Sequence, residues 1–326
     1  MKDLTVITCT YNRGYCLHQL YESLCRQTSD DFLWLVVDDG STDQTASLVT
    51  GWKAEGRIEI EYHYKAHGGL HTALNLAYSL VKTELNTVVD SDDWLTDDAV
   101  EKIVPFWKRN RADCFYGIVA ENISPDGKLR GTELPPVRNC TTAELYGKYR
   151  GRGDKKMILR SDLSALYPYP EFKGETLYPI GYKFLMLDQD YSLLVLRTPV
   201  CVVNYGADSM THTIKEQYRI SARGFSHFRN EAIKRSSSPK GIFRNSIHYI
   251  AESIYAGDRY LIRHSAKPHW TAMCLPFGLL YYAWLEYIRK RDHHAAEQSN
   301  SIITGSVTSE KPTERQTIAG NGEISK

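Results

Sequence analysis

The chain has 326 residues, of which 42% are hydrophobic and 24% charged, so it can bury a substantial core in one large domain or two modest ones. Its 40 Lys and Arg residues are balanced by 39 Asp and Glu residues, giving a formal net charge of +1. This balance gives no broad basic field for binding nucleic acid, so we expect no nucleic-acid partner and expect any anionic ligand to be bound by local groups.

The amino-terminal residues and the cysteines indicate a cytoplasmic protein. The sequence MKDLTVITCT enters a strand-like run within three residues, which leaves no room for a secretory signal peptide. The seven cysteines show neither a CxxC pair nor zinc-ligand spacing. We therefore expect reduced, mostly buried thiols.

The first 110 residues predict four strand-then-helix units. Apolar, β-rich runs at 4–9, 31–39, 57–64 and 86–90 are each followed by a stretch with helical spacing of apolar residues, at 11–28, 41–52, 68–83 and 97–109. Four such units predict an α/β fold, with a Rossmann-like, mainly parallel sheet flanked by helices.

The alternation breaks after Arg111. A hairpin is expected around Pro125-Asp126-Gly127, then loop-rich sequence, and a strand with a loop in residues 199–213. We predict a main domain over 1–212, with halves 1–110 and 111–212. A helical carboxy-terminal region would follow over 213–291, and a disordered polar tail over 292–326.

One stretch of the helical region, from Trp270 to Ile288, contains a single charged residue, Glu286, between basic flanks. Its Pro, Gly and many aromatic residues argue against a simple membrane span. An interfacial helix in peripheral contact with a membrane and an aromatic helix buried against the protein both remain open.

Polar motifs follow all four predicted strands. They are Thr8 to Arg13, Asp38 to Ser41, Lys65 to Gly69, and Asp90 to Asp93. Ligands of open parallel sheets bind outside the carboxyl ends of the strands. Each motif alone is compatible with a simple turn or helix cap, and His67 or His71 with a packed or surface histidine, but their joint order predicts one ligand-binding crevice.

The last motif begins a run of five aspartates in nine positions. Asp90, Asp92 and Asp93 directly follow the strand and would repel one another without a cation. Carboxylates of this kind bind Mg²⁺ or Mn²⁺, which completes its shell with water and substrate phosphates. Asp97 and Asp98 instead lie where Thr96 can cap a helix. Neither GxxxxGK[ST] nor GxGxxG after the first strand is present.

The segments TVITCTYNRG, LYESLCRQTSDDFLWLVVDDGSTDQT, HGGLHTALNLA and VVDSDDWLTDDA together resemble the family 2 glycosyltransferases of the GT-A fold, over residues 3 to 105. The resemblance implies inverting transfer of a sugar from a nucleotide-diphosphate donor to a saccharide acceptor. The later match YGADSMT resembles bacterial enzymes that build surface polysaccharides. No QxxRW motif of the processive synthases is present, so we expect addition of one sugar.

The resemblance also implies roles for individual residues. Thr10, Tyr11 and Arg13 would line the nucleotide pocket, with Lys65 near the donor. Asp38 would bind the base, usually uracil, so a UDP-sugar is expected. Asp90 and Asp92 would occupy the DxD positions, and Asp93, followed by Asp92, would ligate the metal.

Inverting transfer needs a general base, commonly a carboxylate. The family's Glu-Asp pair is missing here, and Glu175 in FKGETLYPIGYKF is the candidate, ahead of Asp188 and Asp190. His212 is a weaker candidate for approaching the metal or the acceptor. If the aromatic segment contacts a membrane, the acceptor would be lipid-linked at the cytoplasmic face. The alternatives are a nucleotidyltransferase of similar fold, which lacks support because no GxGxR-type loop is present, and a nucleotide-sugar-binding protein without catalysis.

Overall fold

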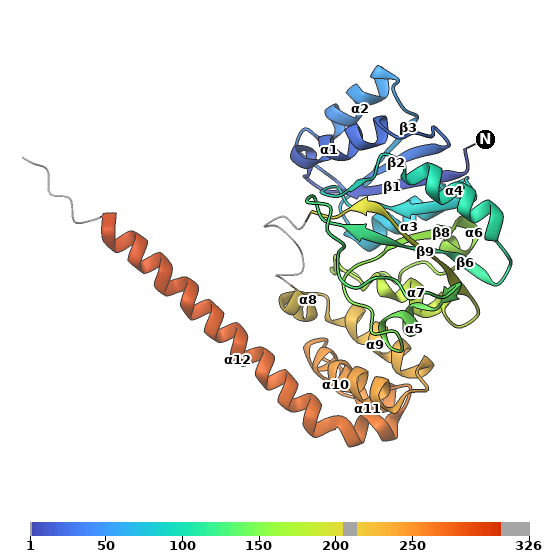
Figure 1. Cartoon of the computed structure of the whole chain (residues 1–326). Helices are drawn as coiled ribbons and strands as arrows, with labels where there is room; N and C mark the ends of the chain where they lie inside the picture. Colours follow the sequence, from blue (N-terminus) through green and yellow to red (C-terminus); the bar gives the residue numbers. More distant parts are fainter. Residues whose placement is uncertain (1, 205–213, 308–326) are drawn as a thin grey trace, which may run out of the picture.

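The computed structural model describes residues 2–204 and 214–307, with side chains described to residue 292. Its centre is a nine-stranded mixed sheet in the order β3-β2-β1-β4-β8-β6-β9-β5, with β7 paired to β9. Helices cover the sheet, and a helical region follows it at the carboxy-terminal side (Figure 1). His212 and the YGADSMT match, residues 205–211, lie outside the described residues.

The first half of the sheet confirms the four predicted units. Its strands are β1 Leu4–Thr10, β2 Phe32–Asp38, β3 Ile60–Tyr64 and β4 Leu85–Val88, and its helices are α1 Gly14–Cys25, α2 Thr45–Glu55, α3 Leu70–Leu80 and α4 Ala99–Asn110. The pairs β1–β2, β1–β4 and β2–β3 are all parallel. Their carboxyl ends therefore lie along one edge of the sheet.

Alternate residues of the central strands face opposite layers. Val6, Trp34 and Val36 belong to a core with residues of α1, α2 and α4, whereas Ile7 and Leu35 belong to a core with residues of α3. All five side chains are fully buried. A strand buried on both faces must be apolar at nearly every position, which explains the continuous run FLWLVV.

The second half is less regular. It contains β5 Trp94–Leu95, β6 Phe115–Ile123, β7 Asn139–Cys140, β8 Lys156–Arg160 and β9 Ser192–Val202, with short helices α5 Thr142–Tyr146, α6 Ser161–Leu166 and α7 Gly181–Leu187. Strand β8 lies between β4 and β6 and is antiparallel to both. The predicted parallel arrangement therefore holds for the first four strands, and the complete sheet is mixed.

The carboxy-terminal region consists of α8 Ile214–Ile220, α9 Ala222–Arg235, α10 Pro239–Tyr255, α11 Leu261–His264 and α12 Pro268–Val307. The sequence SSSPKG, residues 236–241, separates α9 from α10, where Pro239 occupies the first turn and the Ser238 hydroxyl accepts a hydrogen bond from the Gly241 amide. A small core of Ile233, Ile242, Tyr249, Ile250 and Cys274 joins α9, α10 and α12.

The predicted disordered tail begins too early. Helix α12 continues through residues 292–307, and residues 308–326 lie outside the described part of the chain. The sequence HHAAEQSNS is polar, but it contains strong helix formers and no Pro or Gly before Gly305. A helix already nucleated by packing extends through such a sequence at little cost. Within the described residues, no helix is long and apolar enough to cross a membrane.

Candidate active site

The polar motifs that follow β1, β2 and β3 meet at the carboxyl edge of the sheet. The Asp39 amide donates a hydrogen bond to the Thr10 carbonyl over 2.8 Å. The Lys65 amide similarly reaches the Asp38 carbonyl at 2.9 Å. The loops after these strands are thus extensions of the parallel ladder, which brings three of the four predicted motifs onto one surface.

The loop after β1 is fixed by the loop after β2. Asn12 has a positive φ of 53°. Its amide donates to Ser41 Oγ at 2.8 Å, and its Oδ1 accepts from the Thr42 amide at 2.8 Å. The Gly14 amide, at the start of α1, donates to Asp43 Oδ2 at 3.0 Å. This pairing of loops holds Tyr11 and Arg13, which flank Asn12, in defined positions.

The two aspartates after β2 have different surroundings. Asp38 is fully buried, and its two oxygens accept hydrogen bonds from the Tyr62 hydroxyl and the Ser41 amide, both at 2.7 Å. Asp39 accepts from the amides of Gly68 at 3.0 Å and Gly69 at 2.7 Å. The structure therefore gives Asp38 a local structural contact and makes Asp39 the organiser of the 65–69 turn.

Lys65 belongs to the same network. Its Nζ lies 2.5 Å from Asp39 Oδ1 and donates to Thr72 Oγ1 at 2.8 Å. The side chain is 20% exposed. In contrast, the Thr10 hydroxyl is buried and has no hydrogen-bond partner among the described residues. A buried polar atom of this kind is costly unless a ligand or water satisfies it.

An aromatic pair lies beside these contacts. The rings of Tyr11 and His67 are stacked, with centroids 4.0 Å apart and an interplanar angle of 21°. Tyr11 remains 44% exposed. Gly40, with a φ of 89°, permits this approach, because a Cβ there would lie 2.7 Å from the His67 amide nitrogen. The pair offers a flat aromatic surface to a planar ligand.

The acidic run faces the loop after β1. Arg13 Nη1 lies 2.8 Å from Asp92 Oδ2, and each side chain is about one-quarter exposed. Asp90 is exposed, whereas Asp93 is 6% exposed and accepts a hydrogen bond from the Asn204 amide at 3.0 Å. Asp90 and Asp92 are therefore the more accessible carboxylates, and Asp93 also holds the chain that leaves β9.

The carboxyl groups of Asp90 and Asp93 in the acidic run have raised pKa values. Burial raises the pKa of Asp93 to about 7, with Lys156 opposing the shift and Asp90 adding to it. The pKa of Asp90 is also raised, mainly because protein atoms surround the carboxyl although its surface stays accessible. Lys156 is itself buried and donates to the Val88 carbonyl at 3.0 Å. It is a fixed cation beneath the run.

The residues present fit a hard divalent cation held in part by its substrate. Asp90, Asp92 and Asp93 offer carboxylate oxygens within four residues, and burial, assisted by the neighbouring carboxylates, raises the pKa values of Asp90 and Asp93. Among the described residues, no three or more His, Cys, Asp and Glu side chains are grouped so that they could hold a metal ion by themselves. This is the pattern of Mg²⁺ sites, which use one or two carboxylates together with substrate phosphates.

Comparison with known proteins identifies the first part of the chain. Residues 5–164 match the sequence profile described as Glycosyl transferase family 2. This chain carries a family 2 glycosyltransferase domain. The domain is 31% identical over 199 residues to the poly(ribitol-phosphate) beta-N-acetylglucosaminyltransferase TarP of Staphylococcus aureus. That match spans 59% of this chain and 60% of TarP, so the chain covers less than two thirds of this curated relative.

Solved structures support the fold of the family 2 domain. The S. aureus TarS 1-349 structure in complex with UDP-GlcNAc matches with a TM-score of 0.55 and 17% identity, covering 90% of this chain and 92% of TarS 1-349. The mannosyltransferase PcManGT of Pyrobaculum calidifontis, solved with GDP-Man and Mn²⁺, matches with a TM-score of 0.52 and 16% identity, covering 86% of this chain and 87% of that chain. At these identities the likeness concerns the fold.

Glu175, predicted as the general base, accepts hydrogen bonds from the start of α9. Its Oε1 accepts from the Arg223 amide and Nε, both at 3.0 Å, and its Oε2 accepts from the Gly224 amide at 2.8 Å. The side chain is 7% exposed. These bonds cap the first turn of α9, and they compete with a proton for the same oxygen lone pairs. The geometry favours a structural role over the predicted one.

The two weaker candidates for the base, Asp188 and Asp190, lie between α7 and β9. Asp188 accepts from the amides of Thr142 at 3.1 Å and Ala143 at 2.9 Å, which start α5. Asp190 is exposed in the turn before β9. The structure does not bring Glu175, Asp188 or Asp190 into contact with the acidic run, as far as the described residues show.

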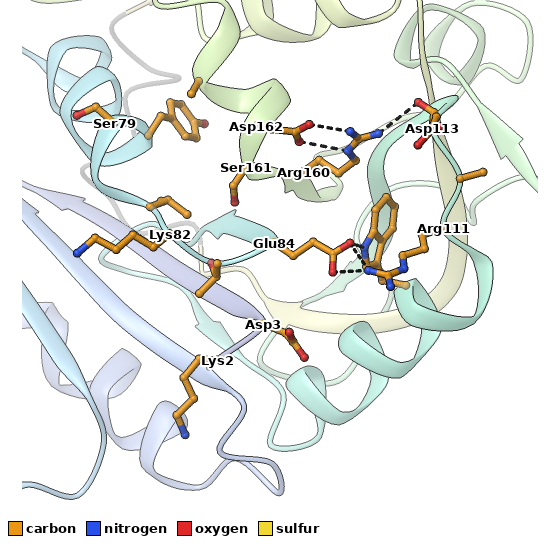
Figure 2. A pocket seen from close by; sticks show the side chains of 16 residues that line it. Lys2, Asp3, Ser79, Lys82, Glu84, Arg111, Asp113, Arg160, Ser161 and Asp162 are labelled. Atoms are coloured by element: carbon orange, nitrogen blue, oxygen red, sulfur yellow. Dashed lines mark hydrogen bonds and ion pairs between the residues drawn. The ribbon is translucent and has the colours of Figure 1, made fainter.

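A cavity of about 960 Å³ lies at the opposite end of the strands. Figure 2 shows it lined by Lys2 and Asp3 before β1 and by Glu84 before β4. Two ion pairs lie within its lining, with Arg111 Nη1 2.6 Å from Glu84 Oε1 and Arg160 Nη2 2.7 Å from Asp162 Oδ2. This cavity shares no residue with the carboxyl-edge site and is not part of it.

Proposed function

We propose that the protein transfers one sugar from a nucleotide-diphosphate donor, a UDP-sugar, to a saccharide acceptor with inversion at the anomeric carbon, in cell-surface polysaccharide synthesis. The observation that carries the proposal is the placement of an exposed aromatic pair, Tyr11 and His67, on the same strand-end surface as the Asp90 to Asp93 run. The two halves of a nucleotide diphosphate, a planar base and an anionic tail, match these two parts.

The base end of the donor would lie on Tyr11. Stacking on an exposed aromatic ring accepts any planar base and contributes roughly 1–3 kcal/mol. The unpaired hydroxyl of Thr10 and the carboxylate of Asp39 border this surface and supply polar groups for the base. Asp38, the sequence-based candidate, would support the loop through Ser41 and Tyr62 instead. A uracil base is supported by the relative TarS, whose structure contains UDP-GlcNAc.

The diphosphate end would lie at the acidic run through Mn²⁺ or Mg²⁺, held by Asp92 with Asp90 or Asp93. When bound, such an ion neutralises the charge on the departing diphosphate. Arg13 orients the Asp92 carboxylate through a charge-assisted hydrogen bond, and Lys156 limits the repulsion between Asp90 and Asp93 from below. Both cations keep the carboxylates in place before the donor arrives.

The acceptor hydroxyl must lose a proton during inverting transfer, and the hydrogen bonds of Glu175 to Arg223 and Gly224 support a structural role for this carboxylate. We propose that Glu175 positions α9. The acceptor is a saccharide, carried on a lipid at the cytoplasmic face of a membrane. The amphipathic character of α12, described below, supports this placement of the acceptor.

The proposal is tested by screening nucleotide sugars for Mn²⁺-dependent binding and turnover by the full chain. We expect one UDP-sugar to bind in the presence of Mn²⁺ and to be hydrolysed slowly without an acceptor. Asp92→Asn should reduce turnover by at least about 100-fold, because loss of a group that acts on developing charge typically costs that much. Asp97→Asn is the matched control, since Asp97 pairs with the exposed Arg26 away from the site.

Equal turnover in Asp92→Asn and the wild type would remove the acidic run from the mechanism. Binding of nucleotide sugars without turnover, with or without saccharide acceptors, would identify a nucleotide-sugar-binding protein. Release of pyrophosphate from a nucleoside triphosphate and a sugar phosphate would identify a nucleotidyltransferase.

A further inference from the structure

The net charge of the chain is +1, but its basic and acidic residues are unevenly distributed along the sequence. Residues 214–292 contain 14 Lys and Arg residues and six Asp and Glu residues, whereas the complete chain has 40 and 39. The helical region is therefore strongly basic and the sheet domain is acidic overall. A local excess of this size attracts anionic partners specifically to the helical region.

The first part of α12 has one buried side and one exposed apolar side. Thr271, Cys274 and Leu285 are at most 5% exposed and face the bundle. Gly278 also lies there, because a Cβ at this position would be 2.6 Å from Ile250 side-chain atoms. The helix is therefore docked through a defined face, which fixes what its other face presents to solvent.

The outward face carries large apolar side chains at helical spacing. Its members, spaced three or four residues apart, are Met273 at 58% exposure, Phe277 at 50%, Leu280 at 69%, Trp284 at 46% and Tyr287 at 65%. At 1.5 Å rise per residue they form a stripe about 21 Å long. Single exposed apolar residues are common, but a continuous stripe indicates an interaction surface.

Helix α10 extends this apolar stripe sideways. Phe243 is 37% exposed, and its ring meets that of Phe277 edge-on with centroids 5.4 Å apart. Lys240 and Arg244, on the same helix, are exposed next to Phe243. The surface is therefore wider than one helix and has basic residues along this side.

Basic residues also continue the stripe along α12. Lys290 follows Tyr287 by three residues and Arg291 follows it by four, so both lie on the outward side of the helix. The acid nearest to the stripe, Glu286, is bound by the Tyr255 hydroxyl at 3.0 Å and by Arg289 at 2.8 Å. The exposed charge around the stripe is consequently positive.

We propose that this surface, formed by the α12 stripe with Phe243 and its basic margin, docks on an anionic lipid bilayer with α12 parallel to the membrane plane. Trp and Tyr prefer the headgroup region, and aliphatic and Phe side chains reach the acyl boundary while Lys and Arg meet anionic headgroups. A second copy of the chain is a poorer occupant, because two such surfaces would bring their basic margins together. The docking does not depend on the transfer reaction.

The test is co-sedimentation of the full chain with phosphatidylglycerol vesicles and with phosphatidylcholine vesicles. We expect binding to the anionic vesicles, weakened by high salt, and at least tenfold weaker partitioning for Leu280→Glu and Trp284→Glu. Lys290→Glu with Arg291→Glu should weaken binding to phosphatidylglycerol vesicles alone. Leu166→Glu is the matched control, because Leu166 on α6 is 56% exposed outside this surface. Circular dichroism and thermal unfolding verify that each variant is folded.

Failure of the wild type to sediment with phosphatidylglycerol vesicles overturns the proposal. So does equal partitioning of the wild type and both glutamate variants. A concentration-dependent dimer that Leu280→Glu dissociates, without vesicle binding, would assign the surface to a second copy. Because vesicle binding is measured without donor or acceptor, its result is separate from that of the nucleotide-sugar screen.

Discussion

Arg13 and Asp92 join the loop after β1 to the acidic run through a hydrogen bond of 2.8 Å between Nη1 and Oδ2. The two residues are 79 positions apart in the sequence. Burial of the guanidinium lowers the pKa of Arg13, but the hydrogen bond and the charge of Asp92 raise it by more, so the net shift of the pKa is upward. This pair therefore stays ionised and fixes the direction of the Asp92 carboxylate.

Arg13→Gln should lower the Mn²⁺-dependent affinity for UDP by about 10- to 100-fold, because a hydrogen bond between charged groups contributes about 1.5–3 kcal/mol. Titration calorimetry with UDP measures the change. Arg26→Gln is the matched control, since Arg26 pairs with Asp97 and both side chains are about half exposed, so that pair contributes little. Equal affinity of Arg13→Gln and wild type would show that the pair is not needed at the site.

Tyr11→Ala should weaken UDP binding by about tenfold, since it removes one face of the stacked pair with His67 and the surface for the base. Tyr11→Phe keeps the ring and should bind within about twofold of wild type. Fluorescence titration with UDP distinguishes the two variants. Tyr260→Ala, at an exposed tyrosine of the helical region, controls for general effects of removing a tyrosine. Similar losses in Tyr11→Ala and Tyr11→Phe would argue for the hydroxyl and against stacking.

Gly69→Ala should lower the free energy of unfolding by about 3 kcal/mol or more. Gly69 has a φ of 92°, and a Cβ there would lie 1.7 Å from the Thr176 carbonyl oxygen, so left-handed strain and overlap add together. Gly56→Ala has the strain alone, because its φ is 66° and its Cβ would contact nothing within 4 Å; we expect a loss of about 1–2 kcal/mol. Thermal unfolding ranks the two, and a smaller loss for Gly69→Ala would contradict the packing.

Glu175→Gln separates a helix-capping role from a general base. The amides of Arg223 and Gly224 bind different oxygens of Glu175, so a glutamine keeps an acceptor for one of them and cannot take a proton at neutral pH. If Glu175 only positions α9, turnover should change less than about tenfold, and Glu175→Ala should lower the melting temperature more than Glu175→Gln does. A loss of turnover beyond about 100-fold in Glu175→Gln, with its melting temperature unchanged, would restore the base role.

Glu252 makes the helical region sensitive to pH. It is fully buried between Arg229 and His248, with Oε1 3.4 Å from Arg229 Nε, while its Oε2 is buried without a hydrogen-bond partner among the described residues. Burial raises its pKa from 4.5 to about 7. Since the folded state binds the proton more tightly than the unfolded state, this contribution to stability is present below pH 4.5 and is lost as pH rises through 7.

Glu252→Gln should therefore match wild type near pH 5 and exceed it at pH 8, by up to about 3 kcal/mol in the free energy of unfolding. Denaturant unfolding at the two pH values measures the difference. His248, whose pKa burial lowers to about 4, is present in both proteins. Its protonation lowers the stability of both at acidic pH, so it does not contribute to the difference between them. A difference that does not grow between pH 5 and pH 8 would show that Glu252 is ionised throughout.

Much of the fold follows from the sequence, because the periodicity of apolar residues changes cleanly between strand and helix in the first 110 residues. The mixed second half does not follow, since strands such as β7, with two residues, leave no pattern, and the placement of β8 between β4 and β6 depends on tertiary pairing. The helical structure of residues 292–307 does not follow from the sequence either, because polar composition says little about a helix whose start is fixed by packing.

Within the site, strand-end position predicts which residues gather but not which direction each side chain takes. Asp38 and Asp39 are adjacent, yet one points to Tyr62 and the other to the 65–69 turn. A carboxylate's hydrogen-bond partners come from distant segments, as Glu175 shows by binding the start of α9. Tyr11 and His67 were both noted in the sequence, but their stacking depends on the absence of a side chain at Gly40.

Two adjacent residues connect the carboxyl edge of the sheet to the helical region. The Thr176 carbonyl fills the space that Gly69 leaves empty, while Glu175 holds the amides of Arg223 and Gly224. Helix α9 cannot shift relative to the 65–69 turn without breaking one of these two contacts. Glu175 and Thr176 therefore tie the position of α9 to the turn organised by Asp39, beside the hydrogen bond of 2.9 Å between Tyr178 and His227 of α9.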